Sequence, residues 1–549
     1  SVRSGERFAW QDADAIVNLS SAADLNLLWE RIDAAGLHPE GLICLSGAGD
    51  AANSAYDTIL QILQTAGARR RFLRRFEFIT TSAESVSGEP LTHPASGELH
   101  GLARTIPAEF DSSECRCIDV ELPEHDLQPV VQQLLDELST SGANLTIAYR
   151  GGVRWQKGWS PALLKGSSES PFRRGGVYLI TGGVGGIGYV VAKHLLQNHA
   201  ARVTLVGRTT VPDHNDWESW ILSHGEGDPI SRRIRRLQDL EQAGGEVLFQ
   251  AADVADRDAM RLVLEQTQQQ FGPLNGVIHA AGVPGGNRLL LQPLDEARQI
   301  RRPKIDGSRV IAELLQGSRI DFLLFCSSIS ASVPAASQSA YAAANAFQNA
   351  FAEYCRSALH VPAIAIGFDG WREVGMLADT HVPVGLESYY EERMRSALTN
   401  SEGIEVIHRA LTQWRGSQIL VSAMDFDRLS TAAHAFAPIA PRYDDHVAAD
   451  AQGRELKVII EIWKDLLGVD SISPSDNFFT LGGHSLMGTM MIARIRDRLG
   501  VTLSLRDVFE ERTPEGIAAL VCSRAEEKTP VEQVAQPAPS DDKREVFEF

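Results

Sequence analysis

Three polar residues in the second half of the sequence have the types and the spacing that reduction of a carbonyl group requires. Ser328 ends the apolar run FLLFCSS, while Tyr341 and Asn345 lie four residues apart in YAAANAF, on one face of an expected helix. Carbonyl reduction needs a proton for the oxygen and a hydrogen bond that polarises the carbonyl beforehand. Tyr341 can supply the proton, and Ser328 can supply the hydrogen bond.

A tyrosine in this role needs a cation beside it. A free phenol has a pKa of about 10 and exchanges protons poorly near neutral pH unless a positive charge lies close by. Lys304, in RRPKIDG, is the candidate for that charge. Singly, a core tyrosine, a helix-capping serine and a surface lysine are the commoner roles, but their joint occurrence behind a nucleotide-binding motif favours catalysis.

That motif is the glycine-rich run ITGGVGGIG, which joins an apolar strand to an amphipathic helix. Glycines there leave room for a pyrophosphate at the helix N-terminus, although the same turn could exist without a ligand. The next strand ends in Arg208, where a fold specific for NAD often carries Asp or Glu, so NADPH is favoured. The strand EVLFQAADV fits an adenine contact and HAAG fits the nicotinamide half. The expected cofactor-binding residues are Gly182, Gly183, Val184, Gly185, Gly186, Ile187, Gly188, Arg208, Asp253, Val254, Ala280 and Ala281.

Alternating strands and helices must position these residues. The apolar runs VYLITGG, VTLVGR, EVLFQAADV, LNGVIHAAG, FLLFCSS and AIAIGFD predict strands of a parallel sheet, and GLICLS, FEFITT and NLTIAYR predict an earlier α/β region. The helix DTILQILQTAGARRRFLRRF belongs to that earlier region. Three helical patterns near the C-terminus predict a small bundle. The fold class is therefore α/β, with two tandem Rossmann-like units followed by a small all-α four-helix domain. The expected boundaries are 1–165, 166–427, a linker at 428–452, the helical domain at 453–525 and a flexible tail at 526–549.

Composition excludes several classes of function. The chain has 549 residues and a net charge of −19, which argues against nucleic acid as the main partner. No apolar stretch is long enough to cross a membrane, and the opening SVRSGERFAW has no signal core, so a cytoplasmic piece of a longer protein is expected. The six cysteines include one close pair, Cys115 and Cys117, and no cluster at metal-ligand spacing, so no metal is expected.

The motifs TGGVGGIG, ADV, HAAG and YAAANAF, together with a spacing of thirteen from Ser328 to Tyr341, resemble short-chain dehydrogenases, and specifically the ketoreductase domains of type I polyketide synthases. Free-standing members usually place lysine four residues after the tyrosine. Here Asn345 stands at that position and Lys304 lies upstream, an exchange characteristic of the synthase domains, and the resemblance gives Asn345 a catalytic role. The first α/β region is similar to their structural subdomain, and the stretch around Met376 is similar to their lid.

The resemblance continues into DNFFTLGGHSLMG, which is similar to acyl carrier proteins. It implies that Ser485 carries 4′-phosphopantetheine, delivered by a phosphopantetheinyl transferase; a helix-capping serine is the plain alternative. The sequence GGHSL is also frequent in peptidyl carriers. The implied partners are the acyl chain on the carrier, upstream ketosynthase and acyltransferase domains, and a downstream synthase or synthetase module.

The resemblance thus implies reduction of a carrier-tethered β-ketoacyl thioester with NADPH. Two alternatives stay open: an α-ketoacyl reductase with a peptidyl carrier from a depsipeptide-forming nonribosomal synthetase, and a redox-silent scaffold. The hydroxyl configuration also stays open, because Pro284, Gly285 and Gly286 replace the Leu-Asp-Asp marker of one class. Val333 replaces the tryptophan that marks the other class. The sequence does not give the oligomeric state.

Overall fold

The computed structural model falls into two compact units, each described by itself. The first holds Ser1–Val382 and Leu386–Ala440, and the second holds Pro383–Gly385 and Pro441–Phe549. The expected linker, apart from Leu429 and Gln452, and the expected tail, apart from Glu526, lie outside the described residues. The structure describes residues 1–5, 8–11, 14–46, 55–69, 71, 73–110, 113–123, 125–140, 146–166, 169–285, 287–333, 336–378, 394–426, 429, 452–467, 472–478, 481, 485–499, 501, 503, 507–508 and 511–526.

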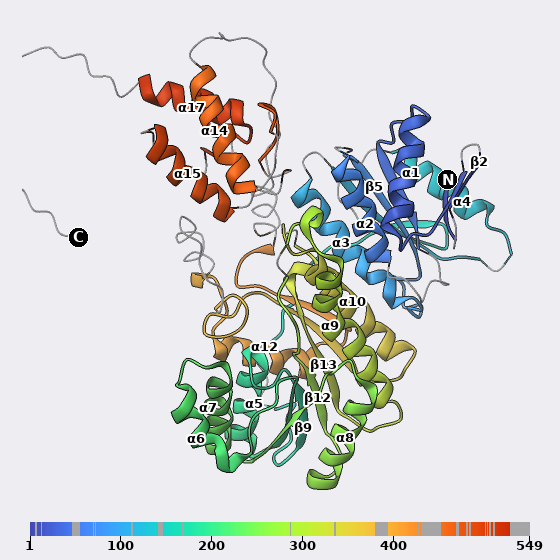
Figure 1. Cartoon of the computed structure of the whole chain (residues 1–549). Coiled ribbons are helices and arrows are strands. Elements are labelled where there is room, and N and C mark those ends of the chain that lie inside the picture. Colours follow the sequence, from blue (N-terminus) through green and yellow to red (C-terminus); the bar gives the residue numbers. More distant parts are fainter. Residues whose placement is uncertain are drawn as a thin grey trace, which may run out of the picture. The chain divides into compact units, whose positions relative to one another are not determined.

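The central subdomain, which runs from β9 to β15, is built on a parallel sheet with the strand order β11-β10-β9-β12-β13-β14-β15 (Figure 1). This order reverses between β9 and β12, as in doubly wound nucleotide-binding folds. The strands are β9 (Val177–Thr181), β10 (Arg202–Gly207), β11 (Glu246–Ala251), β12 (Gly276–His279), β13 (Phe322–Ser328), β14 (Ala363–Phe368) and β15 (Gln418–Val421). The six strands expected from the apolar runs are confirmed, and β15 was not expected.

Helices lie on both faces of this sheet, which explains why most of its strands are apolar on both sides. Their apolar faces and those of the strands form two buried clusters, one on each side. The helices are α5 (Gly186–His199), α6 (Trp217–His224), α7 (Pro229–Gln242), α8 (Arg257–Phe271), α9 (Leu294–Leu314), α10 (Ser339–Ser357) and α12 (Asn400–Gln413), and the short 3-10 turns are η2 (His214–Asp216), η3 (Leu289–Leu291) and η4 (Ile329–Ala331).

The N-terminal subdomain, which runs from β1 to β8, has a second sheet with the order β4-β5-β6-β7-β8, parallel except for β8. A small sheet, β1-β3-β2, precedes it. The elements are β1 (Val2–Ser4), β2 (Ala9–Gln11), β3 (Asp14–Val17), α1 (Ala22–Ala34), β4 (Gly41–Leu45), α2 (Ala55–Ala68), β5 (Arg75–Thr81), η1 (Pro94–Ser96), α3 (Gly97–Glu109), β6 (Glu114–Val120), α4 (Gln128–Ser139), β7 (Thr146–Arg150) and β8 (Val153–Gln156). These two sheets and the helices between their strands confirm the expected α/β fold class with two tandem units.

One helix of this subdomain is shorter than expected. The pattern predicted a helix through RRRFLRRF, but α2 ends at Ala68. The N–H groups of Arg69 and Arg71 both donate to the carbonyl of Ala66, at 3.0 and 2.9 Å, which closes the helix. Strand β5 then begins at Arg75, and Phe76 is buried in the core. The basic run therefore leads from helix to strand.

Helices α3 and α10 join the two subdomains by an unusually close contact. A Cβ atom on Gly101 of α3 would lie 2.4 Å from the carbonyl oxygen of Ala342 in α10 and 2.6 Å from the Cα of Ala343. A Cβ on Gly97, one turn earlier, would lie 3.0 Å from the Cβ of Ala350. The two backbones therefore touch with almost no side chain between them.

A buried ion cluster lies at the same junction. Arg301 of α9 donates to Glu98 of α3 at 2.5 Å and also to Asp57 of α2, and its side chain is only 5% exposed. Its guanidinium also lies 4.2 Å from the centre of the Tyr56 ring. Removing one partner of such a buried pair costs about 3–5 kcal/mol, because the other charge is left without compensation. The cluster therefore holds α9 against the N-terminal subdomain.

The C-terminal unit contains three described helices around one apolar core. They are α14 (Gln452–Leu467), α15 (Ser485–Leu499) and α17 (Pro514–Glu526), in the positions that the sequence predicted. Trp463 is fully buried; its ring packs on Phe478 and its N–H lies 2.9 Å from the sulfur of Met491. Residues 507 and 508 are helical as well, and their neighbours on both sides lie outside the described residues.

The contact between α3 and α10 yields a stability prediction. Gly101→Ala should lower the free energy of unfolding of the first unit by about 1–3 kcal/mol. The added methyl group would clash with backbone atoms of α10, which cannot move away as a flexible side chain could. Chemical denaturation followed by tryptophan fluorescence measures this. Gly158→Ala is the control: a Cβ there meets nothing within 4 Å, so its effect should stay within about 0.5 kcal/mol. Equal stability of the two variants would show that the helices can separate without cost.

Candidate functional site

The expected catalytic residues come from the end of β13 and the first turns of α10. Ser328 is the last residue of β13, and its hydroxyl accepts hydrogen bonds from the N–H and the hydroxyl of Ser330, at 3.2 and 3.0 Å. Tyr341 lies in the first turn of α10. Burial raises the pKa of Tyr341, and its hydrogen bonds with Ser328 and Asn345 oppose that rise. The serine and the tyrosine therefore lie side by side.

Lys304, from the middle of α9, is the buried cation next to them. Its Nζ donates to the backbone carbonyl of Cys326 at 2.6 Å and to Oε1 of Gln348 at 3.0 Å. The same nitrogen is 6.0 Å from the centre of the Tyr341 ring. Burial lowers the pKa of Lys304 to about 8. The lysine is therefore close enough to favour the deprotonated tyrosine electrostatically, and it can still lose its own proton near neutral pH.

His279 supports the lysine from behind. It ends β12, is fully buried, and accepts from the hydroxyl of Thr181 at 2.6 Å through Nδ1. Its Nε2–H donates to the carbonyl of Pro303 at 3.0 Å. Burial, and then the nearby charge of Lys304, lower the pKa of His279 to about 3, so the ring is neutral. His279 therefore connects Thr181, at the end of β9, to Pro303, the residue before Lys304.

Asn345 lies on the same face of α10 as Tyr341, one turn later. Its Nδ2 donates to the carbonyl of Tyr341 at 2.7 Å, and its own carbonyl accepts from the hydroxyl of Ser327 at 3.2 Å. Its Oδ1 is buried and has no hydrogen-bond partner among the described residues. A buried amide oxygen of this kind is unusual, and it can accept a hydrogen bond from a group that enters the site.

The glycine-rich turn forms a cradle at the start of α5. Gly182 has a φ of +71°, and a Cβ there would lie 2.9 Å from backbone atoms of Ala280 and Ala281. A Cβ on Gly188 would lie 2.6 Å from the carbonyl oxygen of Gly182. Glycine is therefore required at these two positions because the turn packs tightly against the segment after β12 and against itself. Cβ atoms on Gly185 and Gly186, which line the cavity, would meet no atom closer than 3.4 Å. The turn therefore leaves the N-terminus of α5 open to an anionic group.

One large cavity, of about 1500 Å³, joins these parts of the central subdomain. Of the residues expected from the sequence, its walls include Gly182, Val184, Gly185, Gly186, Ile187, Arg208, Val254, Ala280, Ala281, Lys304, Ser328 and Tyr341. Gly183, Gly188, Asp253 and Asn345 are not part of the walls. The two glycines allow close packing beneath the turn, and Asp253 is paired with Arg302.

Three basic residues of the cavity were not expected from the sequence. Arg232, Arg233 and Arg236 of α7 line it together with Arg208 at the end of β10. The side chain of Arg236 donates to the carbonyl of Val184 in the glycine-rich turn at 3.1 Å. Their signal in the sequence is the run SRRIRRLQ, which brings basic residues to one helix face by its spacing of three and four.

Glu109, at the end of α3, holds two segments that border the cavity. Its two carboxylate oxygens accept from the N–H groups of Leu289, at 2.6 Å, and Ser337, at 2.9 Å. Burial raises the pKa of Glu109 to about 7, against the effect of these hydrogen bonds. Ser337 has a φ of +62° and lies four residues before Tyr341. The N-terminal subdomain thus fixes the loop that enters the catalytic helix.

The expected lid is only partly described. Met376, with Trp371 and Leu377, lines the cavity, whereas residues 379–393 lie outside the described residues. Gly285 and Val333, at the positions of the stereochemical markers, also line it. A Cβ on Gly285 would lie 3.0 Å from the Cβ of Tyr341, so the residue at this position directly affects the space beside the tyrosine. Pro284 is a further wall residue, and Gly286 lies outside the described residues.

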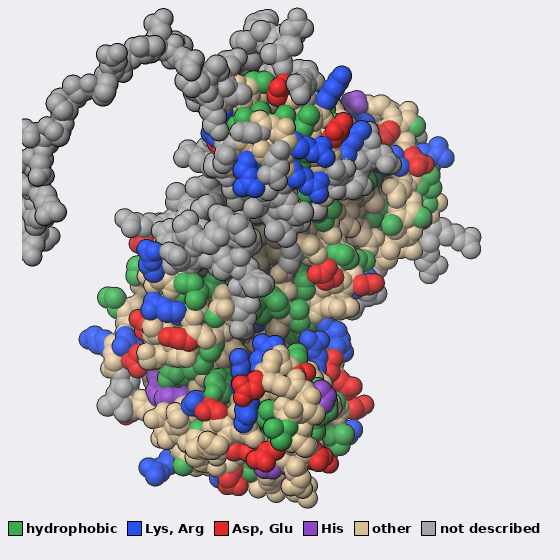
Figure 2. Space-filling view, turned by 60° about the vertical axis from the view of Figure 1, so that its left-hand side comes forward, with side chains coloured by type: hydrophobic (Ala, Val, Ile, Leu, Met, Phe, Trp, Pro, Cys, Tyr) green, Lys and Arg blue, Asp and Glu red, His purple; other side chains and the backbone are tan. Residues whose placement is uncertain are grey.

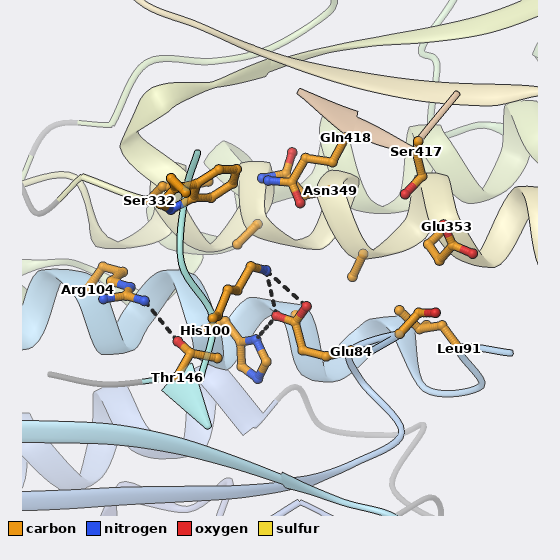
Figure 3. A pocket seen from close by; sticks show the side chains of 18 residues that line it. Glu84, Leu91, His100, Arg104, Thr146, Ser332, Asn349, Glu353, Ser417 and Gln418 are labelled. Atoms are coloured by element: carbon orange, nitrogen blue, oxygen red, sulfur yellow. Dashed lines mark hydrogen bonds and ion pairs between the residues drawn. The ribbon is translucent and has the colours of Figure 1, made fainter. Parts of the chain in front are cut away.

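A smaller cavity, of about 290 Å³, lies elsewhere in the first unit (Figure 3). Its main polar group, Glu84, already accepts two hydrogen bonds from Lys157, at 2.7 and 2.9 Å, and one interaction with His100 at 2.9 Å. No catalytic or cofactor residue expected from the sequence lines it. Its described groups thus form an ion-paired cluster of their own, separate from the catalytic residues.

In the C-terminal unit, Ser485 is the first residue of α15. This position agrees with a modified serine at a helix start. Arg524 pairs with Asp507 at 2.7 and 2.8 Å, which joins α17 to the segment before it.

Charges are mixed over the surface. On the face shown in Figure 2, acidic and basic side chains of the described residues are interspersed among polar and hydrophobic ones. Within the same described part of the chain, no helix is both long and apolar enough to cross a membrane.

Comparison with protein families finds a separate match in each of the two units. The model of the KR domain matches residues 176–373, and the model of the phosphopantetheine attachment site matches residues 457–521. The first match covers the glycine-rich turn, Lys304, Ser328 and Tyr341. The second covers Ser485.

The similar curated proteins are polyketide synthases. The chain is 33% identical to polyketide synthase PksM of Bacillus subtilis over 48% of its own length and 6% of the relative's. It is 28% identical to a phenolphthiocerol/phthiocerol polyketide synthase from Mycobacterium tuberculosis over 78% of its length and 22% of the relative's. The chain thus spans well under a third of these relatives.

Solved structures share the fold of the first unit. A ketoreductase domain from the bacillaene assembly line matches with a TM-score of 0.59 and 22% identity, over 78% of this chain and 98% of that one. A multidomain structure from a keto acid-selecting NRPS module, with adenylation, ketoreductase and pseudo Asub parts, matches with a TM-score of 0.65 and 21% identity, over 78% and 36%.

Fold, motifs and relatives define the class: a ketoreductase, which is an oxidoreductase that uses a nicotinamide cofactor, followed by a carrier domain for 4′-phosphopantetheine. More particularly, the chain is similar to the ketoreductase and carrier regions of polyketide synthases.

Proposed function

We propose that the chain reduces a β-ketoacyl thioester, tethered to its carrier, to the β-hydroxyacyl thioester with NADPH. One observation carries the proposal: a single cavity joins the glycine-rich turn, four arginines, and the serine, tyrosine and lysine of the catalytic end. Cofactor and keto group can therefore meet in one space. The intact turn and tyrosine also favour an active reductase over a redox-silent scaffold.

The residues of the cavity fit NADPH. Gly185 and Gly186 of its turn line the cavity at the N-terminus of α5, where the absence of side chains leaves room for a pyrophosphate. The guanidinium groups of Arg208 and its three neighbours suit a 2′-phosphate, and among the described wall residues the only acid is Asp369, from the segment after β14. When bound, the cofactor supplies the hydride for the keto carbon.

The chain's own residues manage the oxygen and its proton. Ser328 donates a hydrogen bond to the keto oxygen and polarises it, and Tyr341 transfers its phenolic proton to that oxygen as the alkoxide forms. Lys304, on α9, stabilises the resulting phenolate. Asn345 supports the tyrosine, because its Nδ2 donates to the carbonyl of Tyr341 and fixes the helical turn that carries the phenol.

We further propose a division of the chain into a structural subdomain (1–165), a catalytic subdomain (166–427), a linker (428–452) and a carrier (453–525). The linker keeps the carrier at an effective concentration of roughly millimolar, so weak docking is enough for turnover. Upstream ketosynthase and acyltransferase domains supply the keto chain, and a downstream module accepts the alcohol. A carrier loaded with α-keto or β-keto chains, followed by mass spectrometry, distinguishes this function from that of an α-ketoacyl reductase.

Replacing the proton donor tests the proposed chemistry. Tyr341→Phe should lower the kcat for a β-ketoacyl-N-acetylcysteamine thioester at least about 1000-fold, since the proton source is lost. NADPH binding, measured by fluorescence, should stay within about twofold. Tyr354→Phe, three turns later on the same helix and packed on Phe351, is the control and should keep full activity. Unchanged turnover in the first variant would overturn the assignment of Tyr341.

Cofactor preference tests the arginines. Arg208→Ala should weaken the binding of NADPH by about 10- to 100-fold and should leave the binding of NADH almost unchanged. The loss corresponds to the energy of a charge-assisted hydrogen bond, about 1.5–3 kcal/mol. Titration of both cofactors measures this. Arg309→Ala is a matched control, because that arginine lies on α9 and does not line the cavity. Equal losses for both cofactors would show that Arg208 does not contact the 2′-phosphate.

The carrier serine has its own test. Ser485→Ala should abolish the mass gain from a phosphopantetheinyl transferase with CoA, seen by intact-protein mass spectrometry. Reduction of a free thioester should persist, because the proposed catalytic residues all lie in the other unit. Ser523→Ala, on α17, is the control and should be modified fully. Modification of the first variant would place the attachment site elsewhere.

A further inference from the structure

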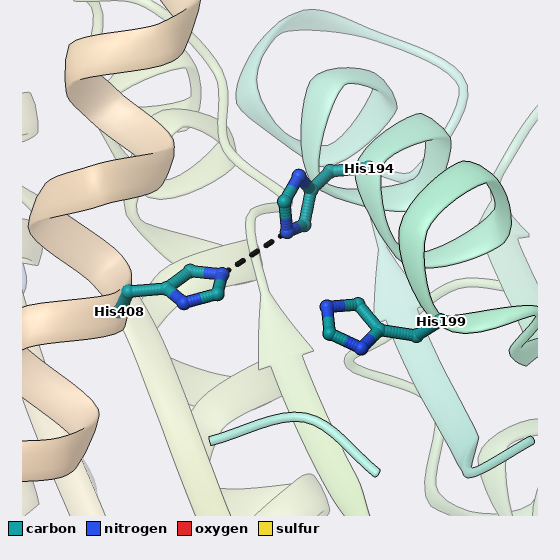
Figure 4. A group of neighbouring side chains, drawn as sticks. All are labelled: His194, His199 and His408. Carbon is teal, nitrogen blue, oxygen red and sulfur yellow. Dashed lines mark hydrogen bonds between the residues drawn. The ribbon is translucent and has the colours of Figure 1, made fainter. Parts of the chain in front are cut away.

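Three histidines of the catalytic subdomain meet at a place that the ketoreductase chemistry does not use (Figure 4). His194 and His199 belong to the last turns of α5, and His408 belongs to α12. One ring nitrogen from each can be chosen so that all three lie within 4.8 Å of one another. The shortest approach, 3.0 Å, joins Nε2 of His194 to Nε2 of His408.

We propose that His194, His199 and His408 bind one Zn²⁺ ion, which clamps helix α5 to helix α12. Imidazole nitrogens are common zinc ligands, and a site with three protein ligands takes a water molecule as its fourth. Each of the three side chains is half-buried, so an ion can enter from solvent. The sequence predicted no metal, because the third ligand comes 209 residues after the second.

The ring positions come close to what the ion requires. Tetrahedral zinc with bonds of about 2.0–2.1 Å keeps its donor nitrogens about 3.4 Å apart and the ring centres about 5 Å apart. The ring centre of His194 is 5.4 Å from that of His199 and 5.1 Å from that of His408. The remaining pair, His199 and His408, is 6.3 Å apart, so a side-chain shift of about 1 Å would complete the set.

The protonation state also suits a metal. Burial, and then the other two rings, lower the pKa of His194 to about 4, and burial lowers the pKa of His199 and of His408. The rings are therefore neutral near pH 7, which is the form that binds metal. No hydrogen bond joins a ring nitrogen of His199 to another described residue, so its lone pair is available.

Neighbouring groups hold the rings in place. Phe172 packs its ring against all three, with centres 5.0–6.0 Å apart. The amide of Asn198 lies 3.1 Å from Nδ1 of His194, where its oxygen, after a half-turn of the amide, can accept the N–H of a metal-bound ring. Glu405, whose negative charge opposes the lowering of the His408 pKa, pairs with Arg409 at 2.6 Å. The carboxylate thus stays with the arginine, and the donor set is three imidazoles.

The position indicates a structural role. Helix α5 starts at the glycine-rich turn and ends at His199, so the site lies about 20 Å along the helix from the cofactor end. Helix α12 packs on α5 near the C-terminal end of the catalytic subdomain. An ion between them would hold the cofactor helix against the last helix of the fold without touching the substrate.

The experiment uses the full chain without an affinity tag, freed of metal by a chelator. Competition with a chromophoric chelator measures Zn²⁺ affinity and stoichiometry. We expect one ion per chain with a Kd below about 1 µM, and an increase of about 3–10 °C in the melting temperature of the first unit. Co²⁺ should give the intense visible absorption of a tetrahedral site.

His408→Gln and His194→Gln should each weaken zinc binding at least about 30-fold and remove the thermal shift. His214→Gln, an exposed histidine on the same subdomain, is the control and should behave as the unchanged chain. Circular dichroism verifies that each variant folds. A Kd above about 100 µM for the unchanged chain, or equal affinity in His408→Gln, would overturn the proposal. Reduction of a free thioester at room temperature should not depend on zinc, so this test stands apart from that of the reductase function.

Discussion

The close approach of α3 to α10 is the contact on which the catalytic site depends. Where Gly101 meets Ala342, the backbones touch, and a contact without side chains leaves no freedom for either helix to shift. Helix α10 carries Tyr341 and Asn345. The positions of these two residues therefore depend on packing against α3, a helix of the N-terminal subdomain. A subdomain without a glycine-rich turn thereby takes part in the chemistry through packing.

The charged groups at that junction act in the same direction. Arg301 pairs with two acids of the N-terminal subdomain, and Glu109 accepts hydrogen bonds from two loops of the central subdomain. These are costly groups to bury, and each is satisfied only when both subdomains are in place. Lys304 is three residues after Arg301 on α9. The ion cluster therefore also fixes the helix that carries Lys304, the proposed catalytic cation.

Much of this arrangement could be predicted from the sequence, and the exceptions have physical reasons. The strands β9 to β14 are apolar runs, and the catalytic residues stand at their ends or on a helix with regular spacing. Strand β6 was missed because Arg116 interrupts its apolar pattern; it is buried all the same, since Glu77 and Glu137 pair with it. The arginines of α7 and the three histidines depend on tertiary contacts between helices, which spacing along the chain does not show.

The charges of the large cavity oppose the charge of the chain as a whole. The whole protein has a net charge of −19, yet the described walls of the large cavity carry four arginines and Lys304 against one acid. A cleft lined by charges of one sign raises the local concentration of ligands of the opposite sign. The basic walls therefore favour an anionic ligand such as a phosphorylated nucleotide, in a chain whose net charge alone would repel it.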